Sequence, residues 1–130
     1  MNDNSKKKFN HIKVHTQYSI CEGALKISDL SLLCKKEKIK ALGLCDTNNL
    51  CGALEFSEAI SKSGTQPIIG TQLNIKYKNH EGLIPIFARN LEGYKNLIKL
   101  SSKSFLDISE AETPHCTIKD ITELSNGLAI

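Results

Sequence analysis

The sequence predicts an α/β fold, in which strands alternate with helices and helical crossovers join parallel strands. The apolar run Ala41–Cys45 is short and uninterrupted, as expected of a strand that is covered on both faces. On either side of it, apolar residues recur at helical spacing. Residues 72–77 alternate between polar and apolar side chains, which predicts a half-buried strand. This order of elements is typical of βαβ units in a parallel sheet.

The first part of the chain predicts a tail, a strand and a helix. Residues 1–8 are polar and lysine-rich, and we expect them to form a flexible basic tail. Residues 9–16 are predicted to form a strand. Ser28 can cap a helix that runs to about Lys38, with lysines in its last turn that complement the helix dipole. The expected buried positions of this helix are Leu30, Leu33 and Cys34.

The middle of the chain predicts a helix followed by a β-hairpin. The helix covers about residues 50–63 and stops at Gly64. A strand over residues 67–77, a turn at residues 79–82 and a returning strand over residues 83–88 form the hairpin. The expected buried stripe of the helix consists of Ala53, Phe56 and Ile60.

The last part predicts two further helices and one strand. Asn90 can cap the first helix, and residues 104–116 are predicted to form a loop. Thr117 and Asp120 have the spacing of a capping box that opens the second helix. Residues 127–130 resemble the start of another parallel strand. The expected buried positions are Tyr94, Leu97, Ile98 and Leu100 or Ser101 in the first helix, and Ile118, Ile121 and Leu124 in the second.

A parallel strand that stops after residue 130 leaves the backbone groups of its partners without pairing. We therefore expect an incomplete fold: a truncated piece of a longer protein, a remnant of a broken gene or a partial sequence. A fold of this kind exposes a strand edge and apolar surface, so we expect marginal stability or self-association in isolation.

Composition and charge indicate a cytoplasmic protein with reduced thiols. The 130 residues suffice for one domain with a core. The net charge is +3, but Arg89 is the only arginine, which disfavours a dedicated reader of nucleic-acid sequence. The five cysteines form no C-x-x-C pair, and the sequence shows neither a signal peptide nor an apolar run of membrane length. We therefore expect free thiols and no membrane association.

The segment from His11 to His15 is the most informative one for function. On an extended strand, Lys13 lies on the same face as both histidines. Two imidazoles suggest a metal site, but an ammonium group has no lone pair to donate and repels a cation. A thiol nucleophile at Cys45 or Cys51 is an alternative, although a buried structural cysteine is the more common arrangement.

Five stretches of the chain resemble, in order and spacing, the N-terminal domain of bacterial DNA polymerase III alpha subunits, which belongs to the PHP (polymerase and histidinol phosphatase) superfamily. The stretches are residues 9–19, 22–24, 45–56, 67–70 and 92–97. Each one is a weak signal, whereas five in register are a strong one. The resemblance implies that residues 9–130 are a partial PHP domain and that the chain lacks the polymerase domain.

The same resemblance implies a distorted TIM-like barrel with a metal site at the carboxyl ends of its strands. A complete barrel takes about 250 residues, so this chain would supply the N-terminal half, including a β-hairpin and incomplete at the C-terminus. In metal-binding members, ligands occupy the positions of Lys13, His15, Glu22, Asp46, Thr47, Gln72 and Leu83. Only His15, Glu22 and Asp46 still carry a ligand side chain. We expect a vestigial site without a bound metal, another cofactor or a catalytic residue.

Two more specific expectations concern the polar side chains near this site. Lys13 is expected to pair with Glu22 or Asp46 and to occupy the space of a cation. His11 lies outside the matched ligand pair and is expected to make a structural hydrogen bond.

Three functions are compatible with these residues. The lost ligands favour a structural module of the replicative alpha subunit, which docks the epsilon proofreading exonuclease subunit and meets DNA only indirectly through the holoenzyme. The remainder of the alpha subunit would be a further partner. The alternative is a metal-dependent PHP phosphoesterase, either a 3'-5' proofreading exonuclease or a small-molecule phosphatase, which needs several ligands to hold cations and activate water. The third is an α/β domain with ordinary histidines, a description that suits His80 and His115.

Overall fold

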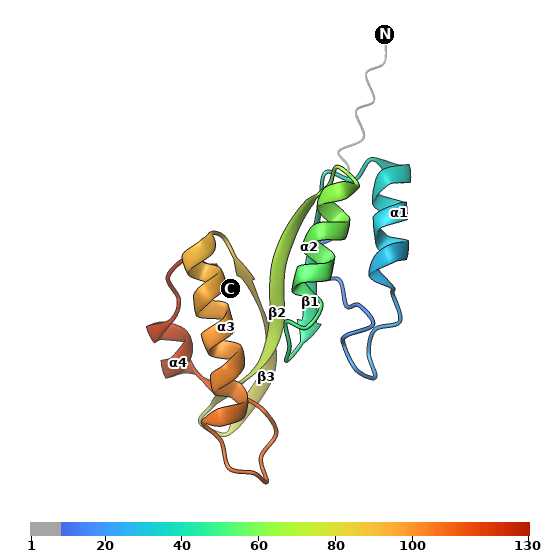
Figure 1. Ribbon diagram of the computed structural model, residues 1–130. Helices are drawn as coiled ribbons and strands as arrows, with labels where there is room; N and C mark the ends of the chain where they lie inside the picture. Colours follow the sequence, from blue (N-terminus) through green and yellow to red (C-terminus); the bar gives the residue numbers. More distant parts are fainter. Residues whose placement is uncertain (1–8) are drawn as a thin grey trace.

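The computed structural model describes residues 9–130 (Figure 1), so the predicted basic tail at residues 1–8 lies outside the described residues. Strands and helices alternate, which confirms the α/β class. The elements are α1 (Ile27–Glu37), β1 (Ala41–Thr47), α2 (Ala53–Lys62), β2 (Gln66–Tyr77), β3 (His80–Ala88), α3 (Leu91–Leu106), β4 (Cys116–Thr117), α4 (Ile118–Glu123) and β5 (Leu128–Ala129).

The sheet is mixed, so the expectation of a parallel sheet was wrong. Its strand order is β1-β2-β3-β5, and β4 pairs with β2. β1 and β2 are parallel and joined by α2, whereas β2 and β3 form the expected antiparallel hairpin. β5 pairs antiparallel with β3, which corrects the parallel strand expected at residues 127–130. The hairpin reverses the chain direction after β2, because a short turn can join only antiparallel strands.

The segment before α1 also differs from its prediction. Residues 9–16 form no strand and contact β1 through an isolated parallel bridge between Val14 and Leu44. The Val14 amide donates to the Gly43 carbonyl at 3.0 Å. A Cβ at Gly43 would overlap the backbone of Ile12, so the glycine permits this close approach.

Helix boundaries and turns differ from the predictions by a few residues. α1 is preceded by Lys26 as N-cap rather than Ser28, and no side chain caps it. The hairpin turn consists of Lys78 and Asn79, so His80 already belongs to β3. α3 runs to Leu106, a few residues into the predicted loop.

Both predicted polar caps are confirmed. The Asn90 side chain accepts a hydrogen bond from the Gly93 amide at 2.8 Å, and Thr117 and Asp120 form a capping box. Three residues expected to be buried are instead exposed: Leu33, Ile98 and Ile118. They flank the stripes that do face the core, because a helix offers only part of its circumference to a sheet.

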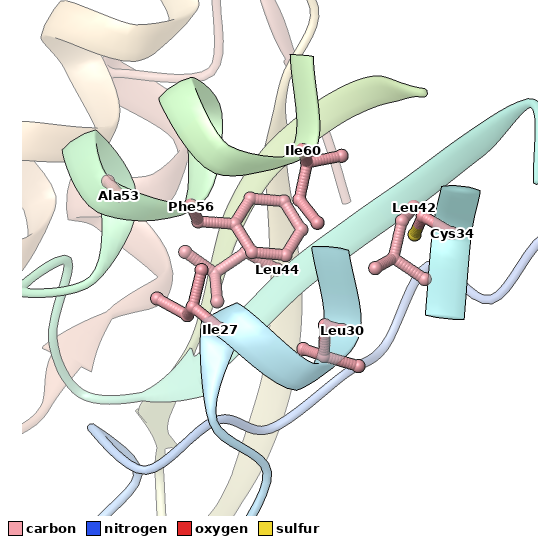
Figure 2. Packing of buried hydrophobic residues seen from close by; sticks show 8 residues of the cluster. All are labelled: Ile27, Leu30, Cys34, Leu42, Leu44, Ala53, Phe56 and Ile60. Atoms are coloured by element: carbon pink, nitrogen blue, oxygen red, sulfur yellow. The ribbon is translucent and has the colours of Figure 1, made fainter. Parts of the chain in front are cut away.

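Two apolar clusters cover the same face of the twisted sheet. Figure 2 shows the first, in which the Phe56 ring of α2 lies among side chains of α1 and β1. The second consists of Leu73, Ile75, Ile86, Leu97, Leu100, Cys116 and Leu128, and Leu50 packs against both clusters. In the view of Figure 1, α1 and α2 lie to the right of the long β2–β3 hairpin, and α3 and α4 lie to its left. Left and right here refer to the view and not to the two faces of the sheet. The predicted stripe Ala53, Phe56 and Ile60 is confirmed as buried.

Candidate functional site

The candidate site lies at the carboxyl end of β1. There the strand register places Thr47 beside Gln72 of β2. Side chains alternate along a strand, so these two residues project from the sheet face opposite to Leu44 and the helices. The loop that follows Val14 passes over the strand end and adds His15, Ser19 and Glu22 to the site. The resemblance to PHP domains implied a site at this end of the strands.

Asp46 is fully buried, and both of its carboxylate oxygens accept hydrogen bonds from Thr16. Its Oδ1 accepts the Thr16 amide at 2.6 Å, and its Oδ2 accepts the Thr16 hydroxyl at 2.7 Å. Thr71 Oγ1 in turn donates to the Asp46 carbonyl at 2.6 Å. Hydrogen bonds to an ionised acceptor are roughly twice as strong as neutral ones. Asp46 therefore fastens the segment before α1 to the end of β1.

A chain of hydrogen bonds fills the other side of the site. Glu22 Oε2 accepts the hydroxyls of Thr47 and Ser19, the latter at 3.1 Å. The Ser19 Oγ also accepts the Thr47 amide at 2.9 Å. Gln72 Nε2 donates to Thr47 Oγ1 at 2.8 Å. Thr47 and Gln72, which the resemblance places at ligand positions, thus bind the Glu22 carboxylate directly or through one another.

The structure brings together two of the three predicted vestigial positions. His15 Nδ1 lies 3.8 Å from Glu22 Oε2 and 3.3 Å from Ser19 Oγ. Asp46 is engaged separately with Thr16. Within residues 9–130, no group of three or more histidine, cysteine, aspartate and glutamate side chains is placed to hold a metal ion.

The expected ion pair of Lys13 is not present. In the described part of the chain, Lys13 forms no salt bridge with Glu22 or Asp46. Its side chain is exposed, and its charge acts on Glu22 at longer range. Lys13 was expected to pair with Glu22 or Asp46, whereas the carboxylate of Asp46 binds the Thr16 amide and hydroxyl.

The other predicted candidates fall outside the site. His11 contributes a backbone carbonyl that accepts the Gly43 amide at 2.8 Å, and its ring packs edge-on against Phe9. Burial raises the pKa of the Cys45 thiol to about 11, so Cys45 is a packed thiol and not a nucleophile at neutral pH. Cys51 is exposed at the start of α2.

Sequence reasoning missed Thr16 and Ser19, which organise the site. Ser19 and Glu22 have the S-x-x-E spacing of a capping box, and this spacing could have linked the two residues. No local pattern points to the bond between Thr16 and Asp46, because thirty positions separate them in the sequence.

The Glu22 carboxyl is expected to titrate below its ordinary range. The Thr47 hydroxyl bond lowers the pKa of Glu22 most, and Ser19, His15 and Lys13 lower it further. A carboxyl whose pKa is lower in the folded state stabilises the fold above its unfolded pKa of about 4.3. That contribution is lost as the pH falls through the folded pKa.

Carboxyl carbon NMR shifts recorded against pH measure this effect. We expect the Glu22 midpoint to lie below the ordinary pKa of a glutamate, about 4.3, and Thr47→Val to raise it towards that value. Equal Glu22 midpoints in both proteins would show that the Thr47 bond does not hold the carboxylate in solution.

Residues 11–130 match the PHP domain family. The chain belongs to the PHP domain family. Its relatives include the DNA polymerase III alpha subunit of Rickettsia conorii, 39% identical over 121 residues, which are 92% of this PHP chain and 10% of the relative. The alpha subunit of Caulobacter vibrioides is 34% identical over 139 aligned positions, which cover 100% of this chain and 12% of the relative. The alpha subunit of Helicobacter pylori is 36% identical over 109 residues, which cover 78% of this chain and 9% of the relative.

The PHP chain thus spans about a tenth of the length of these curated relatives. A crystal structure of a Bifidobacterium adolescentis protein classed as a metal-dependent phosphoesterase resembles the fold with a TM-score of 0.58. The two sequences are 17% identical, and the match covers 73% of this chain and 32% of the Bifidobacterium chain. This likeness therefore concerns the fold alone. Within residues 9–130, no helix has the length and apolar character needed to cross a membrane.

Proposed function

We propose that this PHP chain is the N-terminal portion of a replicative DNA polymerase III alpha subunit, where it serves as a catalytically degenerate structural module that docks the epsilon exonuclease. The similarity to alpha subunits over at least three quarters of the chain supports the first part. The observation that carries the catalytic degeneracy is the hydrogen-bond chain from Gln72 through Thr47 to Glu22.

The residues of the site do not fit a multinuclear metal centre. A phosphoesterase centre uses anionic and imidazole ligands to hold cations and to lower the pKa of bound water. Here an amide, Gln72, and a hydroxyl, Thr47, stand at two ligand positions, and they provide no anionic charge. A third position, Lys13, adds a positive charge. These side chains therefore support no metal-dependent step.

We further infer that the described sheet is the first part of a larger barrel in the parent protein. In a barrel, the sheet face opposite the helices becomes the interior. That face carries Thr47 and Gln72 here, which supports an interior location for the degenerate site. The β3 edge is paired by β5 only at Phe87 and Ala88, so it leaves room for further strands.

A binding titration with the epsilon subunit of the same organism tests the docking role. The PHP chain is expected to form a complex of one chain with one epsilon subunit, measured by calorimetry and size-exclusion chromatography. An unrelated exonuclease of similar size is the control. No complex at micromolar concentrations of a folded chain would contradict the docking proposal.

The second candidate function is a metal-dependent phosphoesterase. It is favoured by the 3.8 Å approach of His15 to Glu22, which preserves two adjacent ligand types. The test is hydrolysis of labelled single-stranded DNA and of p-nitrophenyl phosphate with manganese or zinc. We expect no turnover above background, whereas turnover abolished by His15→Ala would establish this second function.

A further inference from the structure

A group of exposed lysines lies at the end of the molecule opposite the candidate site. We call it the basic end: Lys35, Lys36, Lys38, Lys40 and Lys62. The first two occupy the last turn of α1, and Lys62 is the last residue of α2. Figure 1 shows that both helices end at the same end of the molecule, where β1 and β2 begin.

Backbone contacts hold the parts of the basic end together. The Lys40 carbonyl accepts the Gln66 amide at 2.9 Å, and the Thr65 hydroxyl donates to the Ile39 carbonyl at 2.7 Å. These bonds tie the turn before β1 to the turn after α2. The five lysines therefore lie around one end of the sheet, on two helices and on the one segment that joins α1 to β1.

The charges of the basic end are not balanced by ion pairs. Among residues 9–130, none of its five lysines forms a salt bridge, and of the other lysines only Lys76, Lys103 and Lys119 do. Two acidic residues lie near these lysines in the sequence: Glu37 stands between Lys36 and Lys38, and Glu58 stands four residues before Lys62. Like charges held close together repel one another, so an anionic partner would stabilise this surface.

Helix dipoles explain only part of this pattern. Lysines in the last turn of a helix complement its negative carboxyl end, which accounts for Lys35, Lys36 and Lys62. Lys38 and Lys40 lie beyond α1, and Lys38 adopts a left-handed backbone conformation with φ 51°. Their positive charges lie beyond the last turn of α1, so the helix dipole does not account for them.

We propose that the basic end binds the phosphate backbone of DNA without reading its sequence. Lysine is a point charge that suits phosphate contacts but lacks the planar fork with which arginine reads bases. The proposal concerns a face remote from the candidate site and is independent of metal binding and of epsilon docking.

Fluorescence anisotropy with a short labelled DNA duplex of mixed sequence tests the proposal on the full chain. Each phosphate contact contributes about −0.9 to the slope of log affinity against log salt, so we expect a slope of about −3 to −4. The triple variant Lys35→Gln, Lys36→Gln and Lys40→Gln should weaken binding at low salt about tenfold or more. It should also make the slope shallower by about 2 to 3.

A matched triple variant removes the same charge elsewhere: Lys78→Gln, Lys95→Gln and Lys99→Gln, all exposed. It should change DNA affinity less than about twofold, and circular dichroism should show that both variants are folded. Equal weakening by both triples, or none by the basic-end triple, would overturn the proposal. A basic-end effect seen with vesicles of phosphatidylserine but not with DNA would overturn it as well.

Discussion

Truncating Phe56 to alanine is expected to lower the free energy of unfolding by about 3–5 kcal/mol. The Phe56 ring is fully buried and fills the space between α1, α2 and β1 (Figure 2). Its removal forfeits the transfer energy of the ring and leaves a cavity that the surrounding elements close only in part. Because a small domain has only about 5–15 kcal/mol of stability, this loss takes a large share of it.

Leu54→Ala is the matched control for this prediction. Leu54 lies on the same helix two residues earlier, and 72% of its side chain is exposed. Its truncation should change the unfolding free energy by less than about 0.5 kcal/mol. Urea unfolding followed by circular dichroism measures both variants. Similar losses for the two would mean that α2 does not pack against β1 as described.

Replacing Asp46 with alanine is expected to cost about 3 kcal/mol of stability. The variant leaves the Thr16 amide and hydroxyl buried without their acceptor and frees the segment before α1. If Asp46 served mainly to hold a metal, its replacement with alanine would instead raise the free energy of unfolding, because repulsion and unpaired charge at such sites reduce stability. The direction of the change therefore distinguishes a structural Asp46 from a ligand.

Glu58→Ala removes an exposed carboxylate from α2 and should be nearly neutral in the same urea experiment. Thr16→Val keeps the size of the side chain but removes its hydroxyl, so it should reproduce part of the Asp46→Ala loss. An Asp46→Ala protein as stable as the parent chain would contradict the structural role of Asp46.

The sequence was sufficient for elements whose local pattern and tertiary packing agree. The apolar run of β1, the Phe56 stripe of α2 and the Asn90 cap of α3 were all predicted and are confirmed. The segment before α1 was misassigned because alternation at residues 11–15 suggests a strand, whereas only Val14 pairs with β1. β4 was missed because two residues are too few to carry a strand pattern.

Strand direction and partner choice were beyond the sequence pattern. Nothing local to residues 127–130 indicates whether the strand there runs parallel or antiparallel, since its partner β3 lies about forty positions earlier. The site shows the same limit. Its location at the end of β1 followed from the resemblance to PHP domains, but the bonds of Asp46 to Thr16 and of Thr47 to Glu22 depend on long-range folding.

The alternation within β2 was only half informative. Leu73 and Ile75 face the core as expected, but the intervening Gln72 and Asn74 are also buried. Both residues take part in polar contacts at the strand end. The Gln72 side chain donates to the Thr47 hydroxyl, and the backbone amide of Asn74 donates to the Asn48 side-chain oxygen at 3.3 Å. Alternation alone predicts that polar residues on this face meet solvent, whereas both are buried here and Gln72 belongs to the candidate site.

The most direct test of the degenerate site is its metal content. The chain is dialysed against manganese and zinc, then against metal-free buffer, and analysed for bound metal. A variant with Lys13→His, Thr47→His and Gln72→Glu restores ligand side chains at three positions and serves as the comparison. We expect substoichiometric metal on the parent chain and a gain of metal on the variant. A full equivalent of metal on the parent chain, lost with Glu22→Gln, would contradict the account.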